Sequence, residues 1–279
     1  METITSRKNP LFQTIRKLNS SNAFRRQQGL FVCEGPKLLA EAVKWGASVE
    51  TAVKAPEFDL PTGLSCRVVE TPADVLQTLA DTEAPQGVVF TCALPDTALP
   101  DKLEKGRYLV LDGVQDPGNV GTIWRTADAF GASGLLLTGE CADPFSPKAV
   151  RASMGACFRL PVWKGEHRAV ADLVKQSGLH LFATALREDT EDVRDVIYRK
   201  AAVVIGSEGK GISEEMLSLC DMTIKIPMEE KCESLNAAVA ATVILWEGKR
   251  QALCPPDLVC LTDEEFKRIF PNGRTGDEW

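Results

Sequence analysis

Apolar segments that alternate with helical patterns fill the second half of this 279-residue chain. The expected strands cover residues 108–113, 134–138, 157–162, 180–185, 202–206 and 222–227, and the expected helices cover 119–130, 147–154, 168–177, 213–219 and 234–250. Runs such as LLL and VVI are apolar without interruption, which is typical of strands buried on both faces of a parallel sheet. The alternation therefore predicts an α/β domain with a mainly parallel sheet.

A smaller α/β unit is expected in front of this domain. Helical patterns at 10–18, 36–45 and 73–79 alternate with short apolar segments at 30–33, 49–53, 66–69 and 88–92. The residues that follow, 93–106, contain two prolines and several charges, which is typical of a linker. We predict domains at residues 1–95 and 107–250, a linker at 96–106 and a C-terminal extension at 251–279.

Composition excludes several classes of protein. The N-terminus lacks the continuous apolar core of a signal peptide, and the longest apolar run, 235–246, is interrupted by polar residues and too short to cross a bilayer. The nine cysteines show no CxxC spacing and only two histidines are present, which argues against a zinc site or a disulfide framework. We therefore expect a cytoplasmic protein without a metal or a membrane partner.

The charge distribution is uneven along the chain. A net charge of −7 argues mildly against a nucleic-acid partner. The first 30 residues differ from this average, because they hold a single acid, Glu2, and six basic residues: Arg7, Lys8, Arg16, Lys17, Arg25 and Arg26. Two interpretations stay open at this point, a solvated helix face or a surface that contacts phosphates.

Polar side chains follow three strands of the second domain. A strand, a Gly/Pro-rich turn and a helix within 109–132 present Asn119 and Arg125; the turn at 206–211 presents Glu208; the segment 226–236 presents Ser234 and Asn236. The carboxyl ends of parallel strands meet at one edge, where open α/β sheets bind ligands, so these side chains are expected to converge. Taken singly, Asn119 and Ser234 could instead cap helices, and Arg125 could be a surface residue.

These three segments resemble the motifs of the SpoU/TrmH branch of the SPOUT RNA ribose methyltransferases. The similar stretches read NVGTIWRTADAFGA, IGSEGKGIS and IPMEEKCESLNAAVAA, with KAVRASMGACFRLPV between the first two. The resemblance spans about residues 107–250, and FVCEGPKLLAEAV and APQGVVF make the first ninety residues similar to the substrate-binding domain of the rRNA-directed members. It implies a trefoil knot in the second domain, a small ribosomal-protein-like α/β first domain, S-adenosylmethionine held in the knot, and a homodimer whose active site combines residues of both subunits.

The resemblance also implies roles for individual residues. Asn119, Arg125, Glu208, Ser234 and Asn236 match the family's catalytic positions, and Gly206, Gly211, Ile226, Met228 and Leu235 match its cofactor contacts. RNA contacts are expected from the six basic residues of the N-terminal stretch. One position departs from the pattern: the family usually has glycine two residues after the methionine of IPM, where this chain has Glu230, and a positive φ there would strain the loop.

The expected reaction is in-line attack of a ribose 2′-hydroxyl on the methyl group of the cofactor. It requires no metal, because the sulfonium is already an activated leaving group, but it requires a positioned hydroxyl and an acceptor for its proton. Both histidines, His167 and His180, lie outside the three motifs. A guanidinium is essentially always protonated, so we expect Arg125 to orient an RNA phosphate and to stabilise the developing alkoxide.

The sequence therefore predicts an S-adenosylmethionine-dependent enzyme that methylates a ribose 2′-hydroxyl of RNA, with ribosomal RNA as the first choice. The alternatives are a catalytically silent RNA-binding paralogue of the same fold, a tRNA-directed methyltransferase, and a metabolic α/β enzyme that binds another nucleotide. The silent paralogue is expected not to bind S-adenosylhomocysteine, whereas the methyltransferase should bind it. The metabolic enzyme is expected to have no affinity for RNA, unlike the other candidates.

Overall fold

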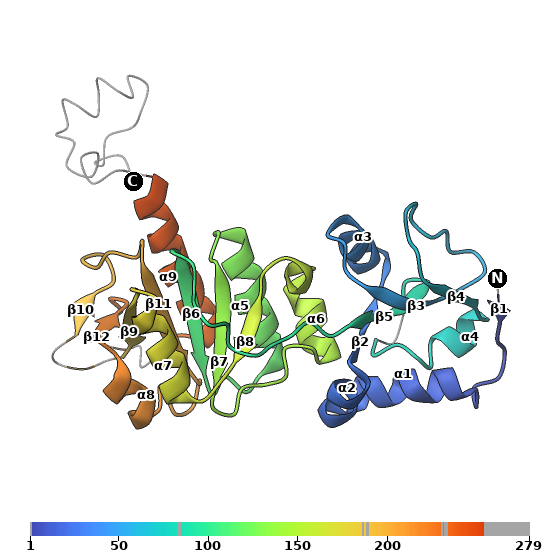
Figure 1. Ribbon diagram of the computed structural model, residues 1–279, viewed down its shortest axis with the longest axis horizontal. Helices are drawn as coiled ribbons and strands as arrows, with labels where there is room; N and C mark the ends of the chain where they lie inside the picture. The colour runs from blue at the N-terminus through green and yellow to red at the C-terminus, as the bar shows by residue number, and fades with distance from the viewer. Residues whose placement is uncertain are drawn as a thin grey trace, which may run out of the picture.

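The computed structural model describes residues 2–82, 85–185, 187, 190–229, 231 and 234–253. These residues form two sheets, one at each end of an elongated molecule (Figure 1). No helix within the described ranges is long and apolar enough to span a bilayer. Residues 254–279, which make up most of the predicted C-terminal extension, lie outside the described residues.

The N-terminal sheet has five strands in the order β1-β4-β3-β5-β2. Its elements are β1 (Glu2–Thr3), α1 (Pro10–Ser20), α2 (Asn22–Gln28), β2 (Leu30–Glu34), α3 (Pro36–Lys44), β3 (Val49–Lys54), β4 (Arg67–Glu70), α4 (Ala73–Leu76) and β5 (Val88–Ala93). The sheet is mixed, because β5 runs antiparallel to both β2 and β3, whereas β4 runs parallel to β1 and β3.

Helix α2 was not expected, because the polar sequence NSSN before it predicts a turn. The turn is there, but it also starts a helix: the Ser21 hydroxyl accepts a hydrogen bond from the backbone N–H of Phe24 at 3.2 Å. Gly29 ends the helix in the left-handed region, with φ 64°. Two adjacent helices therefore carry the basic N-terminal residues.

The C-terminal sheet has seven strands in the order β10-β12-β9-β11-β6-β7-β8, and every pair in it is parallel. Its elements are β6 (Arg107–Asp112), α5 (Pro117–Ala129), β7 (Gly134–Thr138), α6 (Pro147–Ser153), η1 (Ala156–Phe158), β8 (Val162–Lys164), α7 (His167–Gln176), β9 (His180–Thr184), β10 (Glu191–Asp192), β11 (Ala201–Gly206), α8 (Glu214–Leu219), β12 (Met222–Lys225) and α9 (Ala237–Leu253). The predicted α/β class with a mainly parallel sheet is confirmed.

One predicted strand is wrong. Residues 157–162 were expected to form a strand, but Ala156–Phe158 form a short 3-10 helix and β8 begins only at Val162. The chain turns sharply just before, where Met154 and Gly155 both have positive φ. The apolar side chains of this segment are buried against α5 instead of in a ladder, and the indole N–H of Trp124 donates to the Leu160 carbonyl at 2.9 Å.

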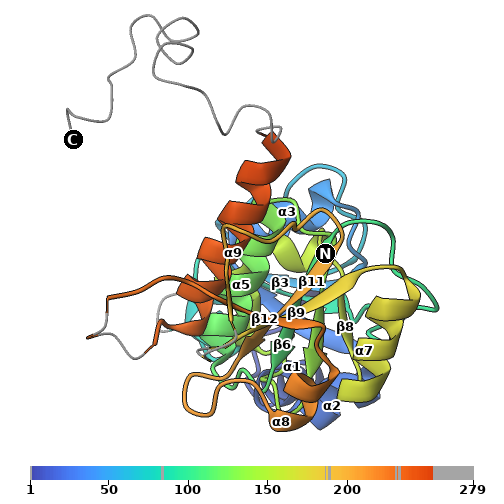
Figure 2. The same ribbon diagram turned by 90° about the vertical axis from the view of Figure 1, so that its left-hand side faces the viewer.

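Helices cover both faces of the parallel sheet (Figure 2). Along β6, Leu109 and Leu111 pack into the layer formed with α5, α6 and α9, whereas Tyr108 and Val110 pack into the layer formed with α7 and α8. Alternate side chains of one strand thus enter two cores, which explains the uninterrupted apolar sequence of the strand.

The two sheets share one hydrophobic core. Phe31 of β2 packs on Phe145 of the other unit, with ring centroids 5.0 Å apart. Arg25 of α2 is 4% exposed and pairs with Asp143 at 2.5 Å. Ion pairs also join Asp81 to Arg151 and Glu41 to Arg159. A buried core with charged contacts around it therefore fixes the orientation of the N-terminal unit.

Candidate active site

The carboxyl ends of β6 and β11 lie in register, with Asp112 opposite Gly206. The segments that leave these two ends meet the start of α9. There the amide of Asn119 donates to the Glu208 carboxylate, and the amide of Asn236 donates to the Asn119 side-chain oxygen at 3.3 Å. Three of the five predicted catalytic residues are thus in one hydrogen-bonded cluster, which we call the Asn119 cluster.

The helix caps leave Asn119 free for this role. Asp116 caps α5 by accepting from the Gly118 N–H at 3.0 Å, and Lys148 pairs with Asp116 at 2.6 Å. Asn119 lies inside the first turn of the helix, so the capping interpretation of this residue is wrong. The cap of α9 is Asn236, which accepts from the Ala238 N–H at 2.9 Å.

The turn after β11 is a closed loop. Ser207 and Gly211 exchange two backbone hydrogen bonds of 3.0 and 2.9 Å, and Gly211 has φ 68°. Gly206 lies directly against the returning chain, since a Cβ at this position would be 2.2 Å from the Gly211 carbonyl carbon. This close approach requires glycine at Gly206.

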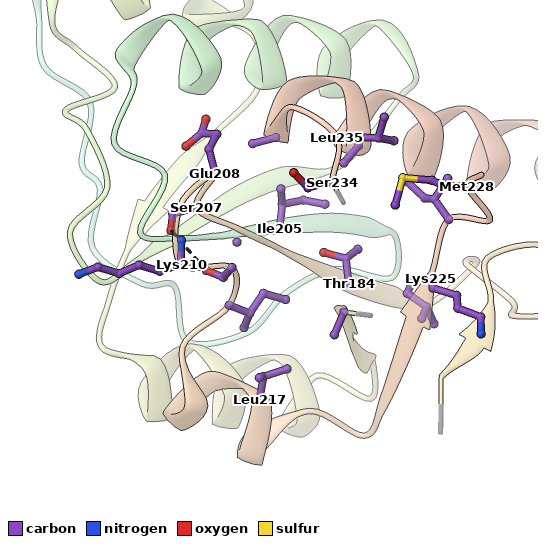
Figure 3. A pocket seen from close by; sticks show the side chains of 18 of the residues that line it. Thr184, Ile205, Ser207, Glu208, Lys210, Leu217, Lys225, Met228, Ser234 and Leu235 are labelled. Atoms are coloured by element: carbon purple, nitrogen blue, oxygen red, sulfur yellow. Dashed lines mark hydrogen bonds between the residues drawn. The ribbon is translucent and has the colours of Figure 1, made fainter. Parts of the chain in front are cut away.

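A pocket of about 400 Å³ lies beside the Asn119 cluster, between the turn after β11 and the segment before α9 (Figure 3). All five predicted cofactor contacts line it: Gly206, Gly211, Ile226, Met228 and Leu235. Glu208 and Ser234 are among its polar lining residues, and Ile205, Ile212 and Leu217 supply apolar surface. A cavity of this size, lined by apolar and polar side chains, fits a small organic ligand.

Sequence reasoning missed several residues of this pocket. Thr184 and Lys225 line it because they end β9 and β12, the two strands next to β11 on one side of the sheet. The rule that parallel strands present their carboxyl ends at one edge applies to these strands too, and it could have found both residues. Glu230, the departure from the family pattern, lies outside the described residues.

Arg125 does not join the Asn119 cluster. It is exposed on α5, and within the described chain no hydrogen bond or ion pair connects it to Asn119, Glu208 or Asn236. Six residues along an α-helix correspond to a rotation of about 240°, so Arg125 and Asn119 point in different directions. Helix α9 packs on another side of α5, where Trp246 contacts Phe130 with ring centroids 5.8 Å apart.

The basic N-terminal residues divide into two groups. Lys8, Lys17 and Arg26 are exposed; Arg7 is exposed and pairs with Asp74, and Arg16 donates to the Arg7 carbonyl. Arg25 is different, because its guanidinium is buried between Asp143 and the carbonyls of Leu18 and Asn19. A surface ligand therefore meets the exposed residues and not Arg25.

Within the described ranges, no group of three or more His, Cys, Asp or Glu side chains is placed to hold a metal ion. The six described cysteines are free thiols. Burial raises the pKa of Cys157 to about 12, so this thiol stays protonated and behaves as a core residue.

Comparison with known proteins agrees with this geometry. The sequence model of the SpoU rRNA Methylase family matches residues 106–246, and that of the MRM3-like substrate binding domain matches residues 9–89. The chain is 32% identical over 251 residues to the 23S rRNA (guanosine(2553)-2′-O)-methyltransferase RlmP of Bacillus subtilis. The alignment covers 88% of this chain and 98% of RlmP.

Two solved structures are similar over nearly their whole length. An AdoMet-bound rRNA methyltransferase from Sinorhizobium meliloti superposes with a TM-score of 0.83 and 32% identity, covering 91% of this chain and 99% of that one. A SpoU methyltransferase from Streptomyces viridochromogenes, solved in complex with the cofactor AdoMet, gives a TM-score of 0.81 and 32% identity, covering 88% and 99%.

Gly206 provides the sharpest test of the pocket. Gly206→Ala forces a methyl group into the returning backbone, so the loop must move, and we expect affinity for S-adenosylhomocysteine to fall at least about tenfold. Gly209→Ala is the matched control in the same loop, because a Cβ there meets nothing within 4 Å. Calorimetric titration of both variants measures the difference, and equal affinities would remove this loop from the ligand site.

Proposed function

The chain belongs to the SpoU rRNA methylase family, and we propose that it methylates a ribose 2′-hydroxyl of ribosomal RNA at the Asn119 cluster. It is an RNA 2′-O-methyltransferase that uses S-adenosylmethionine. The observation that carries the proposal is the juxtaposition of this cluster with the pocket. S-adenosylmethionine would be held in this pocket by Gly206, Ile226 and Leu235, beside Glu208 and Ser234.

The chemistry follows from the groups at this edge of the sheet. Bound S-adenosylmethionine supplies an activated methyl group on a sulfonium. The chain's own residues then have to hold the ribose hydroxyl in line with that group and accept its proton. Glu208 is exposed at the mouth of the pocket, and the Asn119 amide fixes its orientation. Asn236 in turn holds the oxygen of Asn119, so the cluster keeps one geometry during the approach of the RNA.

Arg125 completes the active site of a second subunit in this proposal. The exposed apolar residues of α9 support a homodimer: Val239 is 49% exposed, Trp246 52% and Leu253 64%. They lie on α9, which packs along α5, the helix that carries Arg125. An isologous contact through these two helices buries the apolar side chains and carries each Arg125 toward the partner subunit.

We also propose that the C-terminal unit contains a trefoil knot. Residues from two stretches distant in sequence line the same pocket: Gly206 and Ile212 from one, Ile226 and Ser234 from the other. Helix α9, which follows the second stretch, packs on α5 and β11. These two adjacent loops are the part of the fold in which one segment would thread through the other. A cytoplasmic location stays a prediction from the sequence.

The N-terminal unit is proposed to dock the RNA, as a small ribosomal-protein-like domain. Its exposed cations continue into a groove of about 650 Å³ between the two units. Arg26 of α2 lies on one side of the groove and Lys164, at the carboxyl end of β8, on the other. Among the described residues neither side chain has an ion-pair partner, and both residues are exposed. Phosphates can therefore bind both cations at once.

The activity is tested by mapping 2′-O-methylation in total RNA with and without this protein. We expect one or a few ribosomal sites to disappear without it. Arg125→Ala should fail to restore them while binding S-adenosylhomocysteine normally, because the side chain lies outside the pocket. Loss of a tRNA site instead would contradict the ribosomal assignment. Wild-type protein that does not bind S-adenosylhomocysteine would favour the silent paralogue.

If Arg125 acts on the partner's pocket, two defective variants should complement each other when activity is assayed at an S-adenosylmethionine concentration too low to fill the weakened pocket of Gly206→Ala. Co-expressed Arg125→Ala and Gly206→Ala subunits form mixed dimers with one intact site, composed of the pocket of the first chain and the arginine of the second. Random pairing predicts about a quarter of wild-type activity. If Arg125 acts within its own chain, the mixture stays inactive. Each variant expressed alone is the control.

The groove predicts a specific effect on RNA binding. Reversing both charges, Arg26→Glu with Lys164→Glu, should weaken rRNA binding and make it less dependent on salt, by about one unit of slope for each phosphate that is no longer bound. Affinity for S-adenosylhomocysteine should not change. Lys105→Glu is the control, because this exposed residue lies at the opposite, amino edge of the sheet. Equal RNA affinity of the double variant and the control would exclude the groove.

A further inference from the structure

A buried carboxylate lies behind the pocket, at the end of β6. Asp112 is 4% exposed and accepts three hydrogen bonds: from the Ser213 N–H at 2.7 Å, from His167 Nε2 at 2.8 Å and from the Thr138 hydroxyl at 3.2 Å. Burial raises the pKa of the Asp112 carboxyl, but the bonds from Ser213 and His167 outweigh burial and hold the pKa below its ordinary value. Asp112 is therefore ionised at neutral pH.

The Ser213 bond anchors one end of the loop that forms the pocket wall. The other end is held by the ladder of β11, which stops at Gly206. Between these points, the described hydrogen bonds of residues 207–211 are internal to the loop, apart from the bond between Asn119 and Glu208. The position of the loop relative to the sheet thus depends on the Asp112–Ser213 contact.

His167 forms a hydrogen bond with the Asp112 carboxylate. Its Nε2 contacts Asp112, and its Nδ1 lies 3.2 Å from the Glu215 carboxylate. Ser213, His167 and Asp112 are the residue types of a catalytic triad, but the geometry excludes one. Asp112 and Ser213 approach the same ring nitrogen, and the Ser213 hydroxyl caps α8 by accepting from the Met216 N–H at 3.2 Å.

We propose that Asp112 is a positioning residue for cofactor binding. Through Ser213 it fixes the loop 207–212 against the sheet, and His167 holds the Asp112 carboxylate in place. The inference rests on the proposed function, because it assigns the pocket to the cofactor. Ser213 itself does not line the pocket, whereas its neighbours Ile212 and Glu214 do. The effect therefore passes through backbone position and not through a contact with the ligand.

The test compares three variants. Asp112→Ala leaves the Ser213 N–H without its charged acceptor, and loss of such a bond corresponds to about tenfold or more in affinity for S-adenosylhomocysteine. Asp112→Asn should recover most of this loss, because the amide oxygen accepts from Ser213 and the amide nitrogen can donate to Thr138 and to His167 Nε2 in the tautomer that carries its proton on Nδ1. Asp112→Asn combined with His167→Phe should lose the recovery, since phenylalanine offers no acceptor.

Kinetics separate positioning from a general loss of stability. Asp112→Ala should raise the KM for S-adenosylmethionine with little change in the KM for RNA. Thr71→Ala is the matched control, because it removes a buried hydroxyl that donates to the Ile4 carbonyl at 2.7 Å in the other sheet. It should lower the melting temperature without changing affinity for S-adenosylhomocysteine.

The outcomes distinguish this inference from the function itself. Equal affinity of Asp112→Ala and wild type, or no recovery in Asp112→Asn, would overturn the inference and leave the methyltransferase activity intact. Failure of the wild-type protein to bind S-adenosylhomocysteine would instead overturn the proposed function. Asp112→Asn keeps the test decisive if Asp112→Ala does not fold, because its double variant with His167→Phe still predicts a loss.

Discussion

The register between β6 and β11 is the constraint on which the rest of the site depends. Because the two strands are parallel and end level with each other, Asp112 lies beside Gly206 and can hold the segment that leaves β11. Gly206 lets the loop after β11 fold back on itself, and Asp112 fixes the far end of that loop through Ser213. A shift of one residue would exchange the faces of a strand and separate these contacts.

The parallel sheet and its ligand edge could be predicted because their signals are local. Uninterrupted apolar strands and polar residues at the strand ends predicted the fold class and brought Asn119, Glu208 and Asn236 to one edge. The 3-10 helix at Ala156–Phe158 could not be predicted in this way. Its apolar residues satisfy the pattern of a strand, and only the packing of Trp124 against this segment decides between the two structures.

Arg25, Arg26 and Asp112 have roles that sequence patterns do not predict. Arg25 and Arg26 are adjacent and chemically identical, yet one is buried against Asp143, 118 residues away, and the other is exposed in the groove between the units. Asp112 ends an apolar strand and carries no motif of its own, so its importance depends on three donors from three other segments. The role of each charged residue therefore depends on contacts with residues that are distant in sequence, and the residues next to it in the chain do not predict that role.

The position of Arg125 links the site to assembly. Helix geometry places Asn119 and Arg125 about 240° apart around α5, so that Asn119 joins the hydrogen-bonded cluster and Arg125 is exposed outside it. In the proposed homodimer the guanidinium comes from the partner chain, and the exposed apolar side chains of α9, which packs along α5, supply the contact surface. Catalysis and dimerisation would in that case depend on the same two helices, and a substitution that separates the subunits would inactivate a pocket that still binds its cofactor.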